Sequence, residues 1–135
     1  MRKLTLMIVA AVAVVASIGA LTAGAVTSKP LVAVHLDEFS VFPGTQGAPA
    51  GKVRFVVTNI GRNEHEFVVL KTNKPAGNLL KGNEADESGN VGEIGSVKPG
   101  TAKTLNLTLK PGHYALICNL PGHYKTGQFA DFYVR

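Results

Sequence analysis

The stretch with the clearest chemical content is PGHYALICNLPGHYKTGQ, residues 111–128, where the only cysteine of the chain lies between two copies of PGHY. A thiolate close to an imidazole can bind a transition metal, or can act as nucleophile and base in a hydrolase. His113 and His123 each lie five residues from Cys118, one on either side. The first question is which of them is its partner.

Strand geometry separates the two histidines. His113 precedes Cys118 in HYALIC, an apolar run that predicts a continuous strand. Over five residues at about 3.3 Å each, the two Cα atoms would lie roughly 16 Å apart, with side chains on opposite faces. His123 instead follows Cys118 across Pro121-Gly122, a pair typical of a tight reversal. The loop therefore predicts that His123, and not His113, lies beside the sulfur.

A third ligand must come from elsewhere, because two side chains hold an ion weakly. His65 begins HEFVVL just after the turn-like GRN (61–63), whereas His35 lies inside VAVHLDEF with no adjacent turn. We therefore expect His65 to join Cys118 and His123. One thiolate with imidazoles suits copper, zinc or iron, and the His-Cys-His set is the equatorial shell of blue copper electron-transfer sites.

Such copper sites are completed by a weak axial Met, Gln or backbone oxygen. The only methionines, Met1 and Met7, lie in the apolar leader of the chain. Gln128 lies five residues after His123, where the loop returns into the last expected strand. Its side-chain oxygen is the predicted fourth ligand, and a backbone oxygen is the alternative.

The elements that position these residues are predicted to be strands. Apolar and alternating runs predict strands at residues 31–42, 52–59, 65–70, 104–110, 113–118 and 128–135. Short strands at this spacing indicate an all-β fold in which two sheets form a sandwich. Residues 71–95 are polar and rich in Gly and Asn, and are expected to form one long surface loop.

The first 25 residues have the layout of an export signal. Arg2 and Lys3 precede an uncharged apolar run, and Ala23-Gly24-Ala25 offers a cleavage site. The uncharged run continues to Ser28, so residues 1–25 are either a signal peptide or an N-terminal membrane anchor through residues 4–25. Residues 26–135 then form one domain outside the cytoplasm, periplasmic or extracellular, or held at the outer face of the cytoplasmic membrane.

Charge and cysteine content narrow the function further. Beyond the leader the chain has 12 basic and 9 acidic residues, with no Lys/Arg cluster along the sequence. Nucleic-acid binding is therefore not expected. An exported domain with a single Cys cannot form an internal disulfide, and a metal on the sulfur would explain how a lone thiol persists there.

Several segments together resemble the cupredoxins, and most closely their rusticyanin/sulfocyanin-like branch. The matching segments are HEFVV (65–69) after Asn59, KPGHY (110–114), CNLPGHY (118–124) and GQ (127–128). The resemblance covers most of residues 31–135. It implies a Greek-key β-sandwich of about seven to eight strands that holds one type 1 copper ion through His65, Cys118 and His123. Gln128 stands where the family usually has Met, as in stellacyanin-like variants.

The resemblance also implies a role. The chain would be an electron carrier and not an enzyme, a monomer that shuttles single electrons between redox partners such as a cytochrome or a membrane oxidoreductase. Leu120, Pro121 and Tyr124 would form an apolar collar around the histidine through which electrons leave.

Two further expectations accompany this role. Asn59 and the backbone around Asn119 would form hydrogen bonds near the sulfur. The alternative function on the same fold is a copper chaperone or storage protein, while a cysteine hydrolase would need an oxyanion hole and a cleft that the sequence does not indicate.

Overall fold

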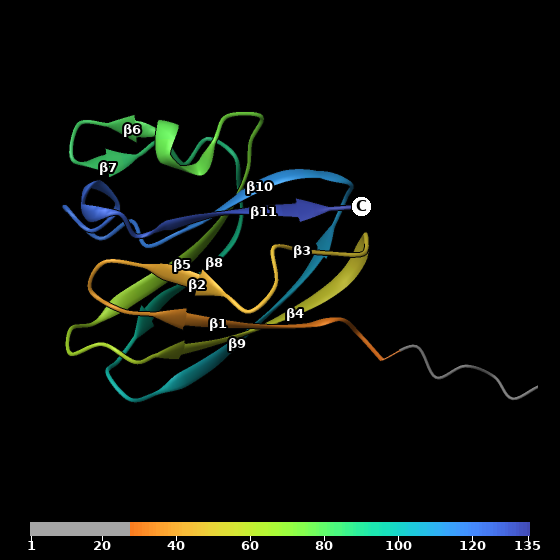
Figure 1. Ribbon diagram of the computed structural model, residues 1–135, viewed down its shortest axis with the longest axis horizontal. Coiled ribbons are helices and arrows are strands. Elements are labelled where there is room, and N and C mark those ends of the chain that lie inside the picture. The colour runs from red at the N-terminus through yellow and green to blue at the C-terminus, as the bar shows by residue number, and fades with distance from the viewer. Residues whose placement is uncertain (1–27) are drawn as a thin grey trace, which may run out of the picture.

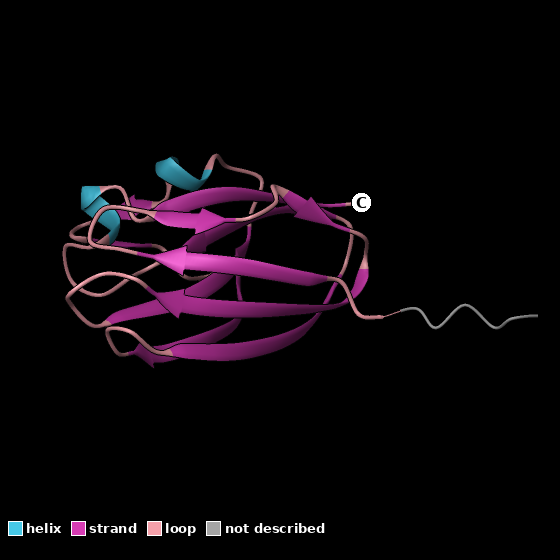
Figure 2. Ribbon diagram, turned by 60° about the horizontal axis from the view of Figure 1, so that its bottom comes forward, coloured by secondary structure: helices cyan, strands magenta, loops and turns pink. Residues whose placement is uncertain are grey.

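A computed structural model describes residues 28–135, and these form a two-sheet β-sandwich (Figures 1 and 2). The expected export signal or anchor at residues 1–25 lies outside the described residues. No helix among the residues that the structure describes is long and apolar enough to cross a membrane.

The first sheet has the strand order β2-β1-β4-β9. Its strands are β1 (Leu31–Leu36), β2 (Val41–Pro43), β4 (Gly51–Asn59) and β9 (Ala102–Leu109). β1 runs parallel to β4, and the other pairs are antiparallel. Alternation is strict in β1, where Val32, Val34 and Leu36 point inward, as expected for a sheet with one solvated face.

The second sheet has the order β3-β11-β10-β5-β8. Its strands are β3 (Gly47–Ala48), β5 (His65–Lys71), β8 (Asn90–Val97), β10 (Gly112–Ile117) and β11 (Phe129–Val134). The central strands β5 and β10 are apolar on both faces, because each face is covered. This explains why HEFVVL and HYALIC do not alternate.

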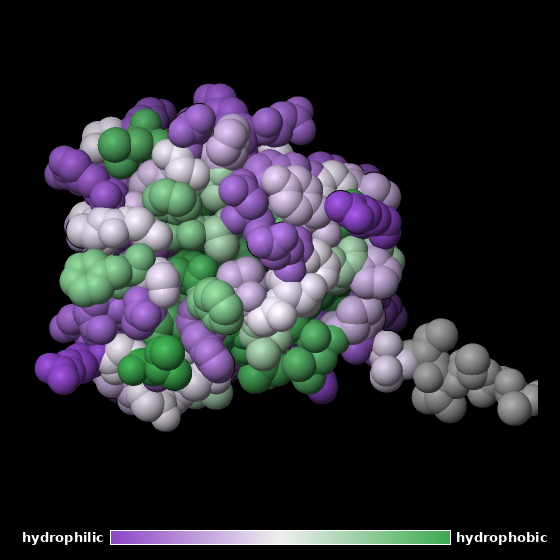
Figure 3. Space-filling model, in the orientation of Figure 1, coloured by the Kyte–Doolittle hydropathy of each residue, from purple (hydrophilic) through white to green (hydrophobic). Residues whose placement is uncertain are grey.

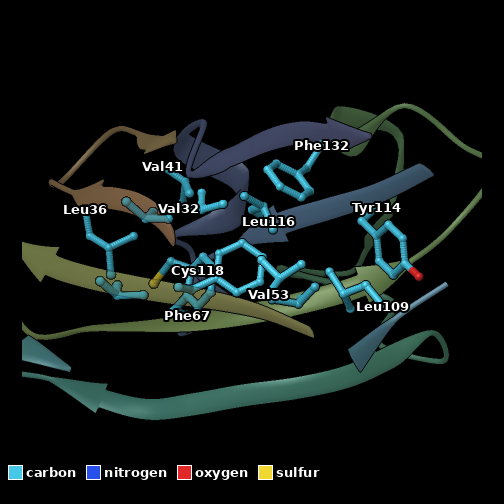
Figure 4. Close-up of a cluster of buried hydrophobic side chains, with 14 of the residues drawn as sticks. Val32, Leu36, Val41, Val53, Phe67, Leu109, Tyr114, Leu116, Cys118 and Phe132 are labelled. Carbon is cyan, nitrogen blue, oxygen red and sulfur yellow. The ribbon is translucent and has the colours of Figure 1, made fainter. Parts of the chain in front are cut away.

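The core between the sheets is built on aromatic side chains. The ring of Phe55 lies 5.5 Å from that of Phe67 and 5.6 Å from that of Phe132, measured between centroids. Figure 4 shows Cys118 at one end of this cluster beside Phe67, and Tyr114 at the other end. The cysteine is thus fixed by close packing at the point where the core meets the loops.

Residues 72–89, which we call the excursion, cover the outer face of the second sheet. The excursion contains the 3₁₀ turn η1 (Ala76–Asn78) and the small hairpin of β6 (Leu80–Lys81) and β7 (Glu84–Ala85). Beneath it lies a second apolar cluster that includes Val68, Ala115 and Tyr124.

The prediction of one loop over residues 71–95 is wrong at its C-terminal end, since residues 90–95 belong to β8, an edge strand paired with β5. Its sequence NVGEIGSV has weak strand character because of its two glycines. The strand forms despite this weak propensity because it pairs with β5, although register shifts interrupt the pairing. Among residues 28–135 there are eleven strands, of which seven have six or more residues and four have only two or three, so the expected sandwich of about seven to eight strands is confirmed.

Candidate metal centre

The predicted ligands meet at one end of the second sheet, which we call the ligand end. His65 is the first residue of β5, and Cys118 directly follows β10, the antiparallel neighbour of β5. The start of one strand therefore lies next to the end of the other. His123 comes from the loop that leaves β10 and ends in η2 (Tyr124–Thr126).

Three side-chain atoms of these residues face one another. The Cys118 Sγ lies 3.8 Å from the His65 Nδ1 and 3.5 Å from the His123 Nδ1, and the two Nδ1 atoms are 3.2 Å apart. A point equidistant from the three lies about 2 Å from each, close to the usual lengths of metal–nitrogen and metal–sulfur bonds. The three groups therefore fit a single metal ion.

The ligand loop is shaped by two glycines. The His123 N–H donates to the Leu120 carbonyl at 2.9 Å, and Gly122 has φ 84°, which makes Leu120–His123 a turn with Pro and Gly at its two central positions. Gly127, with φ 111°, ends η2 in the left-handed region. The Cys118 N–H donates to the Gln128 carbonyl at 3.0 Å and closes the loop.

Burial sets the chemistry of the sulfur. Cys118 is fully buried, which raises the pKa of its thiol, while the N–H of Glu66, 3.4 Å from the sulfur, acts in the opposite direction. Burial, and then the nearby His123, lowers the pKa of His65. A neutral His65 is ready to bind a metal cation without first losing a proton.

His65 also has a buried nitrogen that no other residue satisfies. Its Nε2 has no hydrogen-bond partner among the described residues and lies 3.9 Å from the Glu38 Oε1. The Glu38 carboxylate accepts the N–H groups of Arg62 and Asn63, which lower its pKa. This carboxylate ties the loop before His65 to the loop after β1 and places negative charge on the outer side of the imidazole.

Gln128 is fully buried beside the three ligands, and its side-chain amide nitrogen points toward them. The Nε2 lies 3.3 Å from the His65 Nδ1 and donates to the Asp37 carbonyl, while the Oε1 is buried without a hydrogen-bond partner. The expectation placed the amide oxygen, and not the nitrogen, next to the metal. An amide nitrogen offers no lone pair for a metal, so a half-turn about the Cγ–Cδ bond separates this arrangement from the expected one.

Asn59 does not bond near the sulfur, which corrects that expectation. Its Nδ2 donates to the carbonyls of Asn63 and Val97, both at 2.7 Å, and its Oδ1 accepts the N–H of Gly61 at 2.9 Å. It therefore shapes the turn that leads into His65. The main-chain N–H groups at the sulfur are those of Glu66, at 3.4 Å, and Leu120, and neither was predicted by residue, although Glu66 directly follows a predicted ligand and Leu120 directly follows Asn119.

Asn119 links the ligand loop to the excursion. Its Oδ1 accepts the N–H of Ala85 at 2.6 Å, and its Nδ2 donates to the Ala85 carbonyl at 3.1 Å and to the Glu87 carboxylate at 2.6 Å. Its own main-chain N–H donates to the Glu66 Oε1 at 2.9 Å. The residue lies next to Cys118 in the chain, but its side chain holds the excursion and not the sulfur.

Tyr124 is not part of an exposed collar. It is only 2 % exposed, and its hydroxyl lies 2.9 Å from the N–H of Leu79 and donates to the Ala76 carbonyl. Pro121 is exposed and Leu120 half-buried, so these two remain next to the half-buried His123. The tyrosine ring points inward because the excursion covers it, and nothing in the local sequence indicates this.

The remaining histidines lie away from the ligands. His35 is exposed on β1 opposite Phe42. The His113 Nε2 lies 2.7 Å from the Asp131 Oδ1, and its Nδ1 lies 3.0 Å from the Thr72 carbonyl. As strand geometry predicts, His113 is not part of the cluster.

Comparisons with known proteins identify the fold. No protein-family model matches the chain, and no curated protein matches it. Among solved structures, the auracyanin of the photosynthetic bacterium Roseiflexus castenholzii superposes with a TM-score of 0.60 at 19% identity, covering 80% of this chain and 98% of that one. Rusticyanin from Thiobacillus ferrooxidans gives a TM-score of 0.58 at 19% identity, covering 80% and 79%.

A third neighbour is auracyanin A from Chloroflexus aurantiacus, described as a "blue" copper protein. It gives a TM-score of 0.55 at 20% identity, covering 78% of this chain and 99% of that one. At these identities the likeness establishes the fold, and the chain spans most of the length of each neighbour.

Proposed function

We propose that this chain, which has the cupredoxin fold, is a mononuclear blue copper protein that carries single electrons between redox partners. The observation that supports this most directly is the triangle formed by the Cys118 Sγ and the Nδ1 atoms of His65 and His123, with sides of 3.2–3.8 Å. One buried thiolate with two imidazoles is the donor set of trigonal blue copper sites.

The chain holds these donors in place without help from an ion. His65 and Cys118 are fixed by adjacent strands, and the turn at Leu120–His123 fixes the second imidazole. When bound, copper supplies one-electron chemistry by cycling between Cu(II) and Cu(I). A site held by strands and a closed loop keeps one geometry for both states, so little rearrangement accompanies electron transfer.

Gln128 is the proposed fourth ligand. Its buried Oε1 has no hydrogen-bond partner among the described residues, and a half-turn of the amide would direct this oxygen toward the ligand triangle in place of the Nε2, which would give up its bond to the Asp37 carbonyl. An amide oxygen is a harder donor than the thioether of Met and favours Cu(II). We therefore expect a lower reduction potential than a methionine in this position would give.

Electrons would leave through His123, the only ligand of the three that is not fully buried. Leu120 and Pro121 beside it are uncharged and would allow brief docking with a cytochrome or a membrane oxidoreductase. The role is that of a carrier and not of an enzyme, performed outside the cytoplasm after export.

The alternative, copper delivery or storage on the same fold, is less well supported. Handing a metal ion to a partner requires a second thiol or imidazole to approach the ligands, and Cys118 and His65 are both fully buried. A carrier needs only an exposed edge near the metal, which His123 provides.

Addition of Cu(II) to the purified apoprotein tests the proposal. We expect an intense thiolate-to-copper absorption band in the visible and a narrow copper hyperfine splitting in the EPR spectrum, with one copper per chain. Cys118→Ser should abolish the band. A weak spectrum typical of nitrogen and oxygen ligands, unchanged in Cys118→Ser, would contradict the proposal.

A further inference from the structure

We propose that the end of the sandwich opposite the metal ligands docks on a lipid bilayer that contains anionic phospholipids. This end, which we call the basic end, carries five exposed cations besides Lys71, whose side chain lies beside Gly112 and over the ring of Tyr114. They are Lys29, Lys52, Arg54, Lys110 and Arg135.

The fold gathers these cations from distant parts of the sequence. The N–H of Arg54 donates to the Pro30 carbonyl at 2.9 Å, which places Lys29 beside the start of β4. Gly51 pairs with Leu109, the last residue of β9, so Lys52 in β4 lies close to Lys110, which directly follows β9. The N–H of Ala50 donates to the Arg135 carbonyl at 2.7 Å and brings in the end of β11.

The charge of the domain is polarised along its length. The segments that form the basic end are residues 28–31, 44–54, 106–112 and 133–135, and they contain no acidic side chain. The nine Asp and Glu side chains lie elsewhere, with Asp37, Glu38, Glu64 and Glu66 in or beside the loops of the ligand end. Within residues 28–135 no lysine or arginine lies within 4.0 Å of a carboxylate, so the five cations are free to meet an external anion.

The point at which the apolar N-terminal sequence joins the described chain favours a bilayer over other anionic partners. Residues 4–28 are uncharged and largely apolar, and the described chain begins at Ser28, within the basic end (Figure 1). Leu31 and Tyr133, which lie among the cations, are 50 % and 45 % exposed. In the view of Figure 3, this end of the molecule carries strongly hydrophilic side chains at the C-terminus and a separate apolar patch at the start of β1.

Cations that attract lipid headgroups, apolar side chains among them and an attached apolar segment together suit a membrane surface. An acidic protein or a nucleic acid would use only the cations. Docking in this orientation would direct His123 away from the bilayer, toward soluble partners.

Lysine footprinting of the full chain tests this inference. The chain is mixed with vesicles of phosphatidylcholine alone or with added phosphatidylglycerol, and pulse-labelled with a water-soluble amine-reactive ester. Each cation near an anionic surface increases partitioning about fivefold. We expect Lys29, Lys52 and Lys110 to label severalfold more slowly on the phosphatidylglycerol vesicles, and Lys98, Lys103 and Lys125 near the ligand end to label at an unchanged rate.

Charge reversal and salt give the controls. The triple variant Lys52→Glu/Arg54→Glu/Lys110→Glu should lose the protection of Lys29, and the matched variant Lys98→Glu/Lys103→Glu/Lys125→Glu should keep it. High salt should remove the protection of the basic-end lysines in the wild-type chain. This measurement tests the electrostatic docking even if a variant fails to fold.

Several results would overturn the inference. These are equal labelling on both kinds of vesicle, no association of the full chain with either, protection at the ligand end instead, or protection of the basic end only by an acidic protein or nucleic acid.

Discussion

The main-chain N–H of Leu79 donates to the hydroxyl of Tyr124 at 2.9 Å, so the excursion is bonded to the residue that follows the ligand His123. The same hydroxyl donates to the Ala76 carbonyl, and the neighbouring bonds of Asn119 reach Ala85. The segment 72–89 is therefore part of the support of the metal site, although no residue in it is a ligand.

Tyr124→Phe should destabilise the protein by about 1–3 kcal/mol, because it leaves the buried N–H of Leu79 without its partner. It should also loosen the ligand loop and broaden the copper EPR lines. Denaturant unfolding of the apoprotein and EPR of the copper form check the two effects. Tyr133→Phe, at a residue that is 45 % exposed, is the matched control and should change neither.

Asn59→Ala should lower the free energy of unfolding by a similar amount, about 1–3 kcal/mol. Asn59 is fully buried, and its amide forms hydrogen bonds with two carbonyls and one N–H around the turn before His65. Urea unfolding measures the loss. Asn106→Ala, an exposed position on β9, should be nearly neutral. Equal effects of the two substitutions would show that Asn59 does not organise the turn.

Gln128→Met should raise the reduction potential, because a thioether stabilises Cu(II) less than an amide oxygen does. Protein-film voltammetry measures the change. Gln46→Met, in the loop that leads into β3, makes the same substitution away from the site and should leave the reduction potential unchanged. A fall, or no shift, on Gln128→Met would rule out Gln128 as the axial ligand.

Copper affinity should rise with pH across the neutral range. Burial raises the pKa of the Cys118 thiol, so the apoprotein holds that proton, which copper must displace. Below the thiol pKa the affinity should therefore fall about tenfold for each unit of decreasing pH. The lowered pKa of His65 keeps this imidazole neutral there, so it adds no second proton.

Competition with a Cu(I) chelator at several pH values, under reducing conditions, measures this slope. Cys118→Ser should bind more weakly and show a flatter dependence. A slope near zero for the wild-type protein between pH 6 and pH 8 would mean that the thiol is already ionised in the apoprotein.

Local sequence predicted the parts of the site that depend on local geometry. Strand parity removed His113, and the turn at Pro121-Gly122 indicated His123, since both arguments involve only a few neighbouring residues. His65 was predicted from its place at the start of a strand. The three ligands do lie together because β5 and β10 are antiparallel neighbours in the sheet.

Features that depend on distant segments were not predictable in the same way. Tyr124 is buried only because residues 76–79 fold over it, and β8 forms only because β5 offers an edge. The basic end is likewise invisible as a run in the sequence, since its five cations come from four separate segments. Pairing between distant segments decides each of these, and a single sequence shows it only weakly.

X-ray absorption at the copper edge of the loaded protein tests the central claim most directly, because it counts the atoms bound to the metal. We expect one short copper–sulfur bond and two copper–nitrogen bonds around a single ion, with the sulfur lost in Cys118→Ser. A copper ion with no sulfur neighbour in the wild-type protein would contradict it.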